Sequence, residues 1–302
     1  MIVELLTRLR YRYVPDHIIG EVLGRRWMDN VIPVLLLLAL TTYMAVAVPN
    51  FLSVGNMADT SRQIGEFGLI VIGMSIVMMA GGIDLSVGST FAFANFTSLV
   101  LINVARWPTE VAIAATIGAG ALLGLINGLL IGYLRLRAFL TTLVMLTFTR
   151  AVVDYLLAIY QVQIASSDVE SDLWDYIGAG SILGVPVSFV VLIVLAIAAH
   201  IVLTRLRIGW RIMAVGGSRR SSYNAGIPVR RTICITYVVS GMLAGLAGVL
   251  YAARLSGAGP DTAVVDLRTR ALLPVVGAPL LLDVELERRA GAGEGTGDAS
   301  RL

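Results

Sequence analysis

The sequence contains no lysine, and all 23 of its basic residues are arginine. A Walker A loop needs a lysine to hold nucleotide phosphates, so we do not expect the chain to hydrolyse ATP with that fold. Its one cysteine, Cys234, excludes an internal disulfide and gives no cysteine cluster for a metal. Its two histidines, His17 and His200, lie too far apart in the sequence to suggest a metal site. We therefore expect this chain to bind no metal and no cofactor.

Charged residues are also scarce, at 14% of the 302 residues, whereas 57% are hydrophobic. Soluble domains carry about a quarter of charged residues, so this composition predicts a polytopic membrane protein. Seven apolar runs approach the ~20 residues that a helix needs to cross a bilayer. These expected spans are residues 31–48, 65–80, 90–105, 111–133, 139–160, 187–204 and 232–253. The sequence thus predicts an all-α membrane domain over residues 30–258, preceded by a basic lead-in at 1–29.

The arginines between the spans predict the orientation of the chain, because positive residues of short loops stay on the cytoplasmic side. Arg135 and Arg137 separate spans four and five, and seven arginines lie between spans six and seven, over residues 205–231. The loop at 161–186 instead carries four acidic residues and no arginine, which fits the outer face. We therefore expect a cytoplasmic N-terminus. Since the arginines lie mainly in these loops, no nucleic-acid partner is expected.

Two spans meet directly at residues 81–89, where glycines, a carboxylate and hydroxyls interrupt the apolar sequence. Irregular polar backbone near a bilayer must be covered by protein or water, so this break is typical of a transport pathway. Asp84 has two readings there, contact with a substrate or capping of a helix that starts at Leu85. The polar residues of the spans that form the candidate pathway are Asp84, Ser86, Asn95, Asn127, Arg150 and Asp154.

The other pathway candidates also have structural readings. Asn127 is an amide within span four, and such a group commonly bonds a neighbouring helix. Arg150 and Asp154 lie four residues apart and are able to pair, either for function or as a structural clasp. Glycines recur at four-residue spacing at 120, 124, 128 and 132, and similarly at 241, 245 and 248. Such small-residue ridges allow close helix contact, so they favour a tightly packed bundle.

The long arginine-rich loop contains the signals of a short helix. Gly216 and Gly217 interrupt the chain, Ser218 is suited to an N-cap, and Gly226 supplies a left-handed stop before Pro228. A capped helix outside the membrane, on the side that holds ATP, presents a surface to another protein. The positive-inside rule alone is an equally good explanation of its arginines.

Together these segments resemble the ribose-type sugar permeases of ATP-binding-cassette importers. The resemblance rests on Gly81-Gly82-Ile83-Asp84-Leu85-Ser86-Val87-Gly88-Ser89, Asn127-Gly128-Leu129, Phe139-Leu140-Thr141-Thr142-Leu143, Ala214-Val215-Gly216-Gly217, Ala225-Gly226-Ile227 and Arg230-Arg231. It implies a multi-pass protein of the bacterial plasma membrane, surrounded by lipid. It also implies a second permease copy or sister permease, a separate ATP-binding subunit that uses the ATP, and a periplasmic or lipoprotein sugar-binding protein. The resemblance further assigns an ATPase-coupling helix, formed by Ser218, Arg219, Arg220, Ser221, Ser222, Tyr223, Asn224, Ala225 and Gly226.

The resemblance weakens after residue 258. Members of that family have about ten spanning helices, the later ones completing a structural repeat, but here the apolar stretch 271–282 is short and contains two prolines. Residues 259–302 are expected to form an atypical, largely disordered tail, as a truncated or altered end would give. We expect such a chain to be less stable or inactive, and sugar uptake at normal rates in a permease-deleted cell would refute this.

Two other classes of function remain open from the sequence. An ion-coupled secondary transporter would also place polar groups at helix breaks, but it needs no helix for docking a partner. A membrane-embedded enzyme is less favoured, because no nucleophile and base pattern or metal-ligand cluster occurs in the spans. Uptake by an importer depends on an ATPase subunit, whereas uptake by a secondary transporter depends on an ion gradient. Measuring which of the two is required separates these classes.

Overall fold

The computed structural model describes residues 28–165 and 171–256, and the chain divides into two compact units, residues 1–59 and 60–302. The expected tail at 259–302, and all but the last two residues of the lead-in at 1–29, lie outside the described residues. The first unit contains α3 (Met28–Ala47) and the start of α4 (Val54–Met79). Three successive leucines of α3, Leu35 to Leu37, are each more than half exposed. A helix that presents apolar side chains in this way is suited to lipid.

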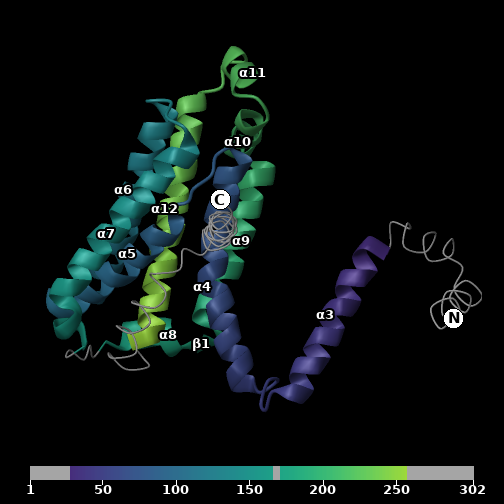
Figure 1. Ribbon diagram of the computed structural model, residues 1–302, viewed down its shortest axis with the longest axis vertical. Coiled ribbons are helices and arrows are strands. Elements are labelled where there is room, and N and C mark those ends of the chain that lie inside the picture. The colour runs from purple at the N-terminus through teal and green to yellow at the C-terminus, as the bar shows by residue number, and fades with distance from the viewer. Residues whose placement is uncertain (1–27, 166–170, 257–302) are drawn as a thin grey trace, which may run out of the picture. The chain divides into compact units, whose positions relative to one another are not determined.

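The described part of the second unit consists of helices and one short hairpin (Figure 1). After α4 the chain forms α5 (Val87–Leu99) with a π-helical end (Val100–Val104), α6 (Thr109–Gly132), α7 (Ala138–Ala165), α8 (Asp172–Ala179), β1 (Ser181–Ile182), β2 (Val185–Pro186), α9 (Val187–Arg205), α10 (Arg207–Gly217), α11 (Arg219–Asn224) and α12 (Val229–Ser256). The two strands pair antiparallel, with Ser181 opposite Pro186.

The predicted all-α membrane fold is confirmed. Six of the described helices are long and apolar enough to cross a membrane: α4, α5 with its π-helical end, α6, α7, α9 and α12. The first expected span, at 31–48, corresponds to α3. Its apolar part, Val31–Ala47, is shorter than the six helices above. The largest difference lies in α4, which begins at Val54 instead of residue 65.

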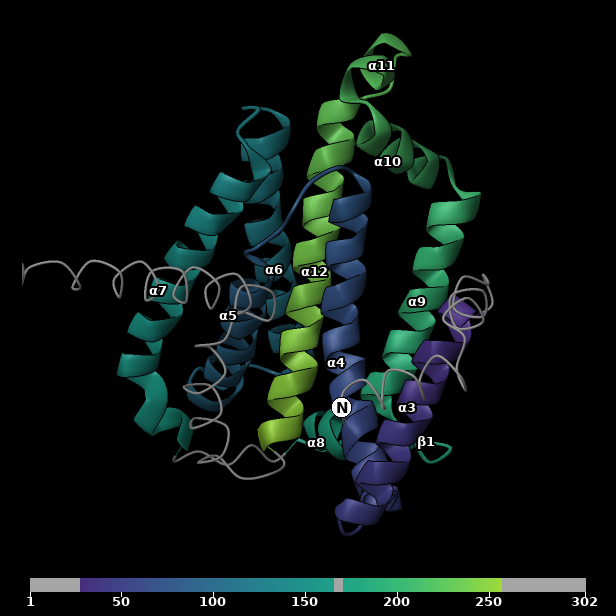
Figure 2. The ribbon, with the colours of Figure 1, turned by 45° about the vertical axis from the view of Figure 1, so that its right-hand side comes forward.

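Helix α12 lies between α4, α5 and α6 and packs most extensively against α6 (Figure 2). Glycines make this close approach possible: a Cβ atom at Gly128 of α6 would lie 2.8 Å from the Cα atom of Cys234, nearer than real Cβ contacts. Gly120 and Gly124 of α6 lie in the same way against Gly241 and Tyr237. The predicted small-residue ridges therefore face each other in the bundle, where van der Waals packing replaces the hydrophobic effect.

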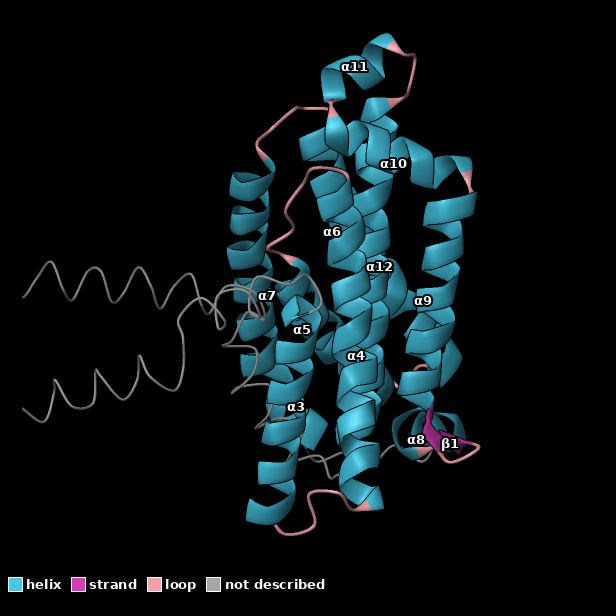
Figure 3. Cartoon of the chain, turned by 90° about the vertical axis from the view of Figure 1, so that its right-hand side faces the viewer, coloured by secondary structure: helices cyan, strands magenta, loops and turns pink. Residues whose placement is uncertain are grey.

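Helices α10 and α11 lie at one end of the second unit, and α8 with the hairpin lies at the other (Figure 3). The turn between α6 and α7 belongs to the end that carries α11, because Arg135 lines the same cavity as Arg219. The acidic residues Asp172 and Asp175 are on α8. The arginine-rich and the acidic connections are therefore separated to opposite ends of the bundle, as the orientation rule requires.

Candidate functional site

Helix α4 ends at a non-helical segment, residues 80–86, which leads into α5. Gly81 has a φ angle of +72°, a left-handed conformation that side chains disfavour, and the amide of Gly82 donates to the carbonyl of Val77 at 3.1 Å. The predicted break at 81–89 is thus present, although α5 starts at Val87 and not at Leu85.

Asp84 connects this segment to α12 and orders the turn before α5 through its carboxylate. One oxygen, Oδ1, accepts hydrogen bonds from the amide and the hydroxyl of Ser86, at 3.1 and 2.6 Å. The other, Oδ2, accepts from the hydroxyl of Ser240 on α12 at 3.0 Å. Asp84 is only 2% exposed. The expectation that Asp84 caps a helix starting at Leu85 is corrected, because Ser86 occupies the cap position and Asp84 orders the turn before it.

Side chains from α6, α7 and α12 hold the rest of the segment. Asn127 of α6 donates through Nδ2 to the hydroxyl of Ser86 at 2.8 Å. The carbonyl oxygen of Ile83 accepts from the Tyr237 hydroxyl at 3.2 Å and from the Thr142 hydroxyl at 3.4 Å. Of the predicted pathway residues, Asp84, Ser86 and Asn127 are therefore brought together.

Sequence reasoning missed three residues that join this cluster, Thr142, Tyr237 and Ser240. Each supplies one side-chain hydroxyl, and such groups are common in membrane helices. Thr142 lies within the 139–143 motif, which was the available signal for it. No comparable signal singled out the two residues of α12.

Asn95, Arg150 and Asp154 form no hydrogen bond to that cluster within the described part of the chain. Asn95 is buried on α5 with its backbone against Gly248 of α12, and its Oδ1 atom has no hydrogen-bond partner in the described part of the chain. On α7, Asp154 is exposed and Arg150 is half-buried. The pair that their spacing allows is not formed among the described residues, whereas Arg254 and Glu66 do form an ion pair. Four-residue spacing permits such a pair, but an exposed carboxylate gains little from it.

The predicted short helix is confirmed as α11, Arg219–Asn224. Its N-cap is Ser218, whose hydroxyl accepts from the amide of Ser221 at 3.3 Å. Gly226 ends it with a φ angle of +78°, and the amide of Ile227 donates to the carbonyl of Ser222 at 3.0 Å. These are the start and stop signals read from the sequence.

Helix α11 and the end of α10 contact the break between α4 and α5. The Arg219 guanidinium donates through Nη2 to the carbonyl oxygen of Gly81 at 3.2 Å. The backbone of Gly216, on α10, lies so close to Met79 that a Cβ atom there would collide with the Met79 carbonyl oxygen. These contacts join α10 and α11 to the end of α4.

The outer surface of α11 is open. Tyr223 is 72% exposed, and Arg219 and Arg220 are also exposed, whereas Ser222 is buried. The exposed side chains of α11 thus include an aromatic ring and two guanidinium groups, together with Ser221 and Asn224.

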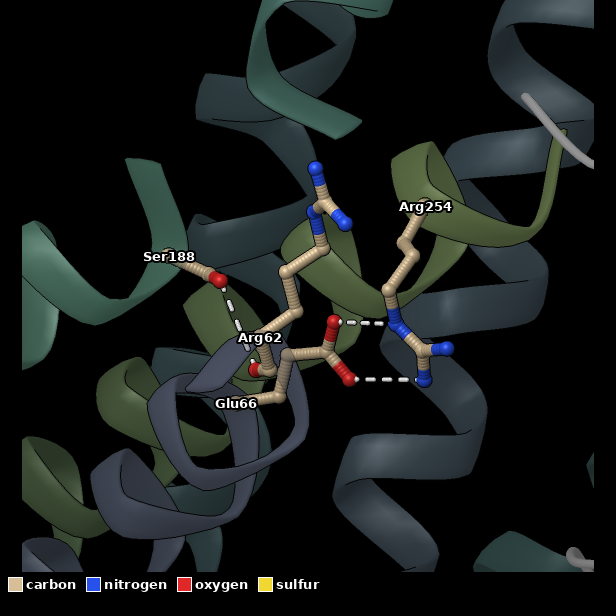
Figure 4. Close-up of polar contacts among 4 residues, drawn as sticks. All are labelled: Arg62, Glu66, Ser188 and Arg254. Carbon is tan, nitrogen blue, oxygen red and sulfur yellow. Dashed lines mark hydrogen bonds and ion pairs between the residues drawn. The ribbon is translucent and has the colours of Figure 1, made fainter. Parts of the chain in front are cut away.

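A buried ion pair joins α4 to α12 (Figure 4). Neither of its residues was among those predicted from the sequence. Arg254 donates to both carboxylate oxygens of Glu66, at 2.7 and 3.0 Å, and Glu66 is fully buried. The Arg254 guanidinium also lies 5.1 Å from the centre of the Tyr251 ring. Nearby, Arg62 donates to the carbonyl oxygen of Ala179 at the end of α8, at 3.1 Å. A charge near an apolar run was the signal that could have identified this pair.

The described residues contain no group of three or more His, Cys, Asp or Glu side chains that could hold a metal ion. The chemistry of the clusters above is hydrogen bonding and ion pairing within a helical bundle.

The chain is similar in sequence to known membrane permeases. Residues 56–277 match the family model described as branched-chain amino acid transport system / permease component. The galactofuranose transporter permease protein of Escherichia coli strain K12 is 30% identical over 83% of this chain and 74% of its own length. The ribose import permease protein of the same strain is 32% identical over 84% and 79%. The L-arabinose ABC transporter permease protein of Azospirillum brasilense is 31% identical over 76% and 66%. No solved structure gave a significant match.

Proposed function

The chain belongs to this family of transport-system permease components, and from that premise we propose that it carries a monosaccharide across the bacterial plasma membrane as part of an ATP-driven importer. It is a multi-pass membrane permease subunit. The proposal extends this to the substrate, the energy source and the orientation, with the N-terminus in the cytoplasm.

The choice of a sugar is supported by the named substrates of the relatives. They are permeases for galactofuranose, ribose, allose and arabinose, all of them sugars, whereas the family model is described by branched-chain amino acids. Because the relatives align with most of this chain, their substrates are the better guide.

The proposed energy source is a separate ATP-binding subunit that docks on α11. The observation that carries this proposal is the contact of α11 and α10 with the helix break, through Arg219 to Gly81 and through Gly216 to Met79. The chain lacks the lysine of a Walker A loop, so ATP would be bound by the partner. A periplasmic or lipoprotein sugar-binding protein and a second permease copy or sister permease complete the proposed complex.

Within the chain, the polar residues divide into two proposed roles. Both oxygens of Asp84 are occupied by Ser86 and Ser240, so Asp84 holds the break in place. The Oδ1 atoms of Asn127 and Asn95 are buried and have no partner among the described residues. Buried polar atoms without partners are costly, and an acceptor of this kind suits a sugar hydroxyl when the pathway opens.

The test is uptake of radiolabelled ribose, arabinose and allose by proteoliposomes that contain the full chain with its ATP-binding subunit and sugar-binding protein. Uptake of one sugar that requires ATP and the ATP-binding subunit would support the proposal. Uptake driven by a sodium or proton gradient without that subunit would overturn it. Omission of ATP from otherwise identical vesicles is the control.

A further inference from the structure

A cavity of about 730 Å³ opens at the end of the bundle that carries α11. Its walls come from the end of α6, the turn that follows it, α11 and the first turns of α12. Five arginines line it: Arg135, Arg219, Arg220, Arg230 and Arg231. All five are exposed, so their guanidinium groups are accessible from the cavity and from outside.

The positive charge of this cavity has no acidic counterpart nearby in the sequence. None of the lining residues is Asp or Glu, and neither of the connections that bear these arginines, residues 133–137 and 205–231, contains one. A concave surface lined by charge of one sign concentrates its field and attracts the opposite charge. The expected occupant is therefore an anion, and guanidinium groups bind phosphate with two parallel hydrogen bonds.

The remaining walls of the cavity are apolar. Ile131, Ile227, Val229 and Ile233 line it together with the arginines. Helix α6 ends at Gly132 and α12 begins at Val229, so these apolar residues lie where two spanning helices leave the membrane core. Tyr133 and Tyr223 also line the cavity, and aromatic residues of this kind are enriched at the membrane–water boundary.

We propose that this cavity binds the headgroup of an anionic phospholipid, with the phosphate on the arginines and the start of the acyl chains along the accessible part of the apolar wall, Tyr133, Ile227 and Val229. Basic pockets between spanning helices on the cytoplasmic side suit such headgroups. A free phosphate would use the arginines but not the apolar walls. An acidic protein segment has no need of a site placed where the spanning helices end. A phospholipid uses both the arginines and the apolar walls, so it is the favoured occupant. Arg219, Arg220 and Tyr223 also belong to α11, on which the ATP-binding subunit is proposed to dock, so the lipid proposal rests on Arg135, Arg230 and Arg231 and does not depend on the transported substrate.

The experiment is native mass spectrometry of the full chain in detergent, titrated with dioleoylphosphatidylglycerol, dioleoylphosphatidylcholine or inorganic phosphate. The test variant is Arg230→Gln with Arg231→Gln, and the matched control is Arg205→Gln with Arg207→Gln, two exposed arginines that do not line the cavity. We expect the phosphatidylglycerol to bind the unaltered chain more tightly than the phosphatidylcholine. The test variant should weaken phosphatidylglycerol binding by about tenfold or more, and the control variant by less than about twofold.

Three results would overturn the proposal. Equal binding of the two lipids, or equal losses in the two variants, would mean that the cavity does not select the headgroup. Binding of inorganic phosphate as tight as that of the lipid would indicate a site for soluble anions. Unchanged phosphatidylglycerol binding in the test variant would mean that Arg230 and Arg231 do not hold the headgroup. If the double variant does not elute as folded protein, Arg135→Gln replaces it with the same expected direction.

Discussion

Asp84 holds the non-helical segment between α4 and α5 with both oxygens of its carboxylate. Asp84→Ala would leave the hydroxyls of Ser86 and Ser240 without their acceptor in a buried position. We expect a loss of about 2 kcal/mol or more in the free energy of unfolding, measured by thermal or denaturant unfolding in detergent. The control is Thr147→Val, whose exposed hydroxyl bonds only to its own helix. Equal stability of the two variants would contradict this role of Asp84.

The Glu66–Arg254 pair gives a second prediction for single residues. Arg254→Ala leaves a fully buried carboxylate without this cation, which we expect to cost about 3 kcal/mol or more. Replacing both partners, Glu66→Leu with Arg254→Leu, removes the buried charge as well and should cost less than the single change. Unfolding of the unaltered chain and the two variants in one detergent gives the comparison, and a double variant less stable than Arg254→Ala would disprove the account.

Single residues were predictable from the sequence where local rules determine them. Ser218 and Gly226 follow from capping and left-handed geometry within a few residues, and both are confirmed. Glu66 and Arg254 are 188 residues apart in the chain, so their pairing depends on how α4 packs against α12. The same holds for Ser240, which only tertiary packing brings to Asp84.

At the level of helices, the contact between α6 and α12 depends on glycine. Gly124→Ala would place a Cβ atom against the carbonyl oxygen of Tyr237, whereas nothing lies within 4 Å of a Cβ atom at Gly118 on the same helix. We expect Gly124→Ala to lower the thermal unfolding temperature clearly, because the two backbones must separate. Gly118→Ala should be neutral or slightly stabilising, since alanine favours helix. Equal melting temperatures would show that this contact contributes nothing.

The contact of α10 with α4 gives a prediction about coupling. Gly216→Ala would separate α10 from Met79, while its neighbour Gly217 has open space around its Cβ position and serves as the control. In proteoliposomes with the ATP-binding subunit, Gly216→Ala should reduce sugar uptake per ATP hydrolysed, and Gly217→Ala should leave the ratio unchanged. A normal ratio in Gly216→Ala would mean that this contact does not transmit the movement.

Apolar runs predicted the helices well but not their ends. The extension of α4 back to Val54 includes Asp59 and Arg62, polar residues that end an apolar run without ending a helix. Backbone hydrogen bonds continue through such residues, so hydropathy alone underestimates the length. It was also not predictable that the glycines of α6 pack against α12. Their spacing indicates that a helix can pack closely, but it does not identify the partner helix.

At the level of the whole molecule, charge and hydropathy predicted an all-α membrane protein, with arginine-rich connections at one end. The structure confirms that arrangement within the second unit, and the sequence comparisons identify the family. The neighbours of α12 could not be predicted. The seven apolar runs have similar composition, so composition does not tell which of them pack against each other within the lipid. Specific packing had to come from residues such as Gly128 and Ser240, whose partners lie far away in the sequence.

The central claim, a membrane conduit driven from the cytoplasm through α11, is tested most directly by labelling engineered cysteines in intact cells with a membrane-impermeant maleimide. Ser221→Cys places a thiol on α11, and Leu183→Cys places one on the fully exposed hairpin turn at the opposite end. The unaltered chain, with its buried Cys234, gives the background. We predict that residue 183 is labelled in intact cells and residue 221 only after the membrane is opened. Labelling of residue 221 in intact cells would contradict the account.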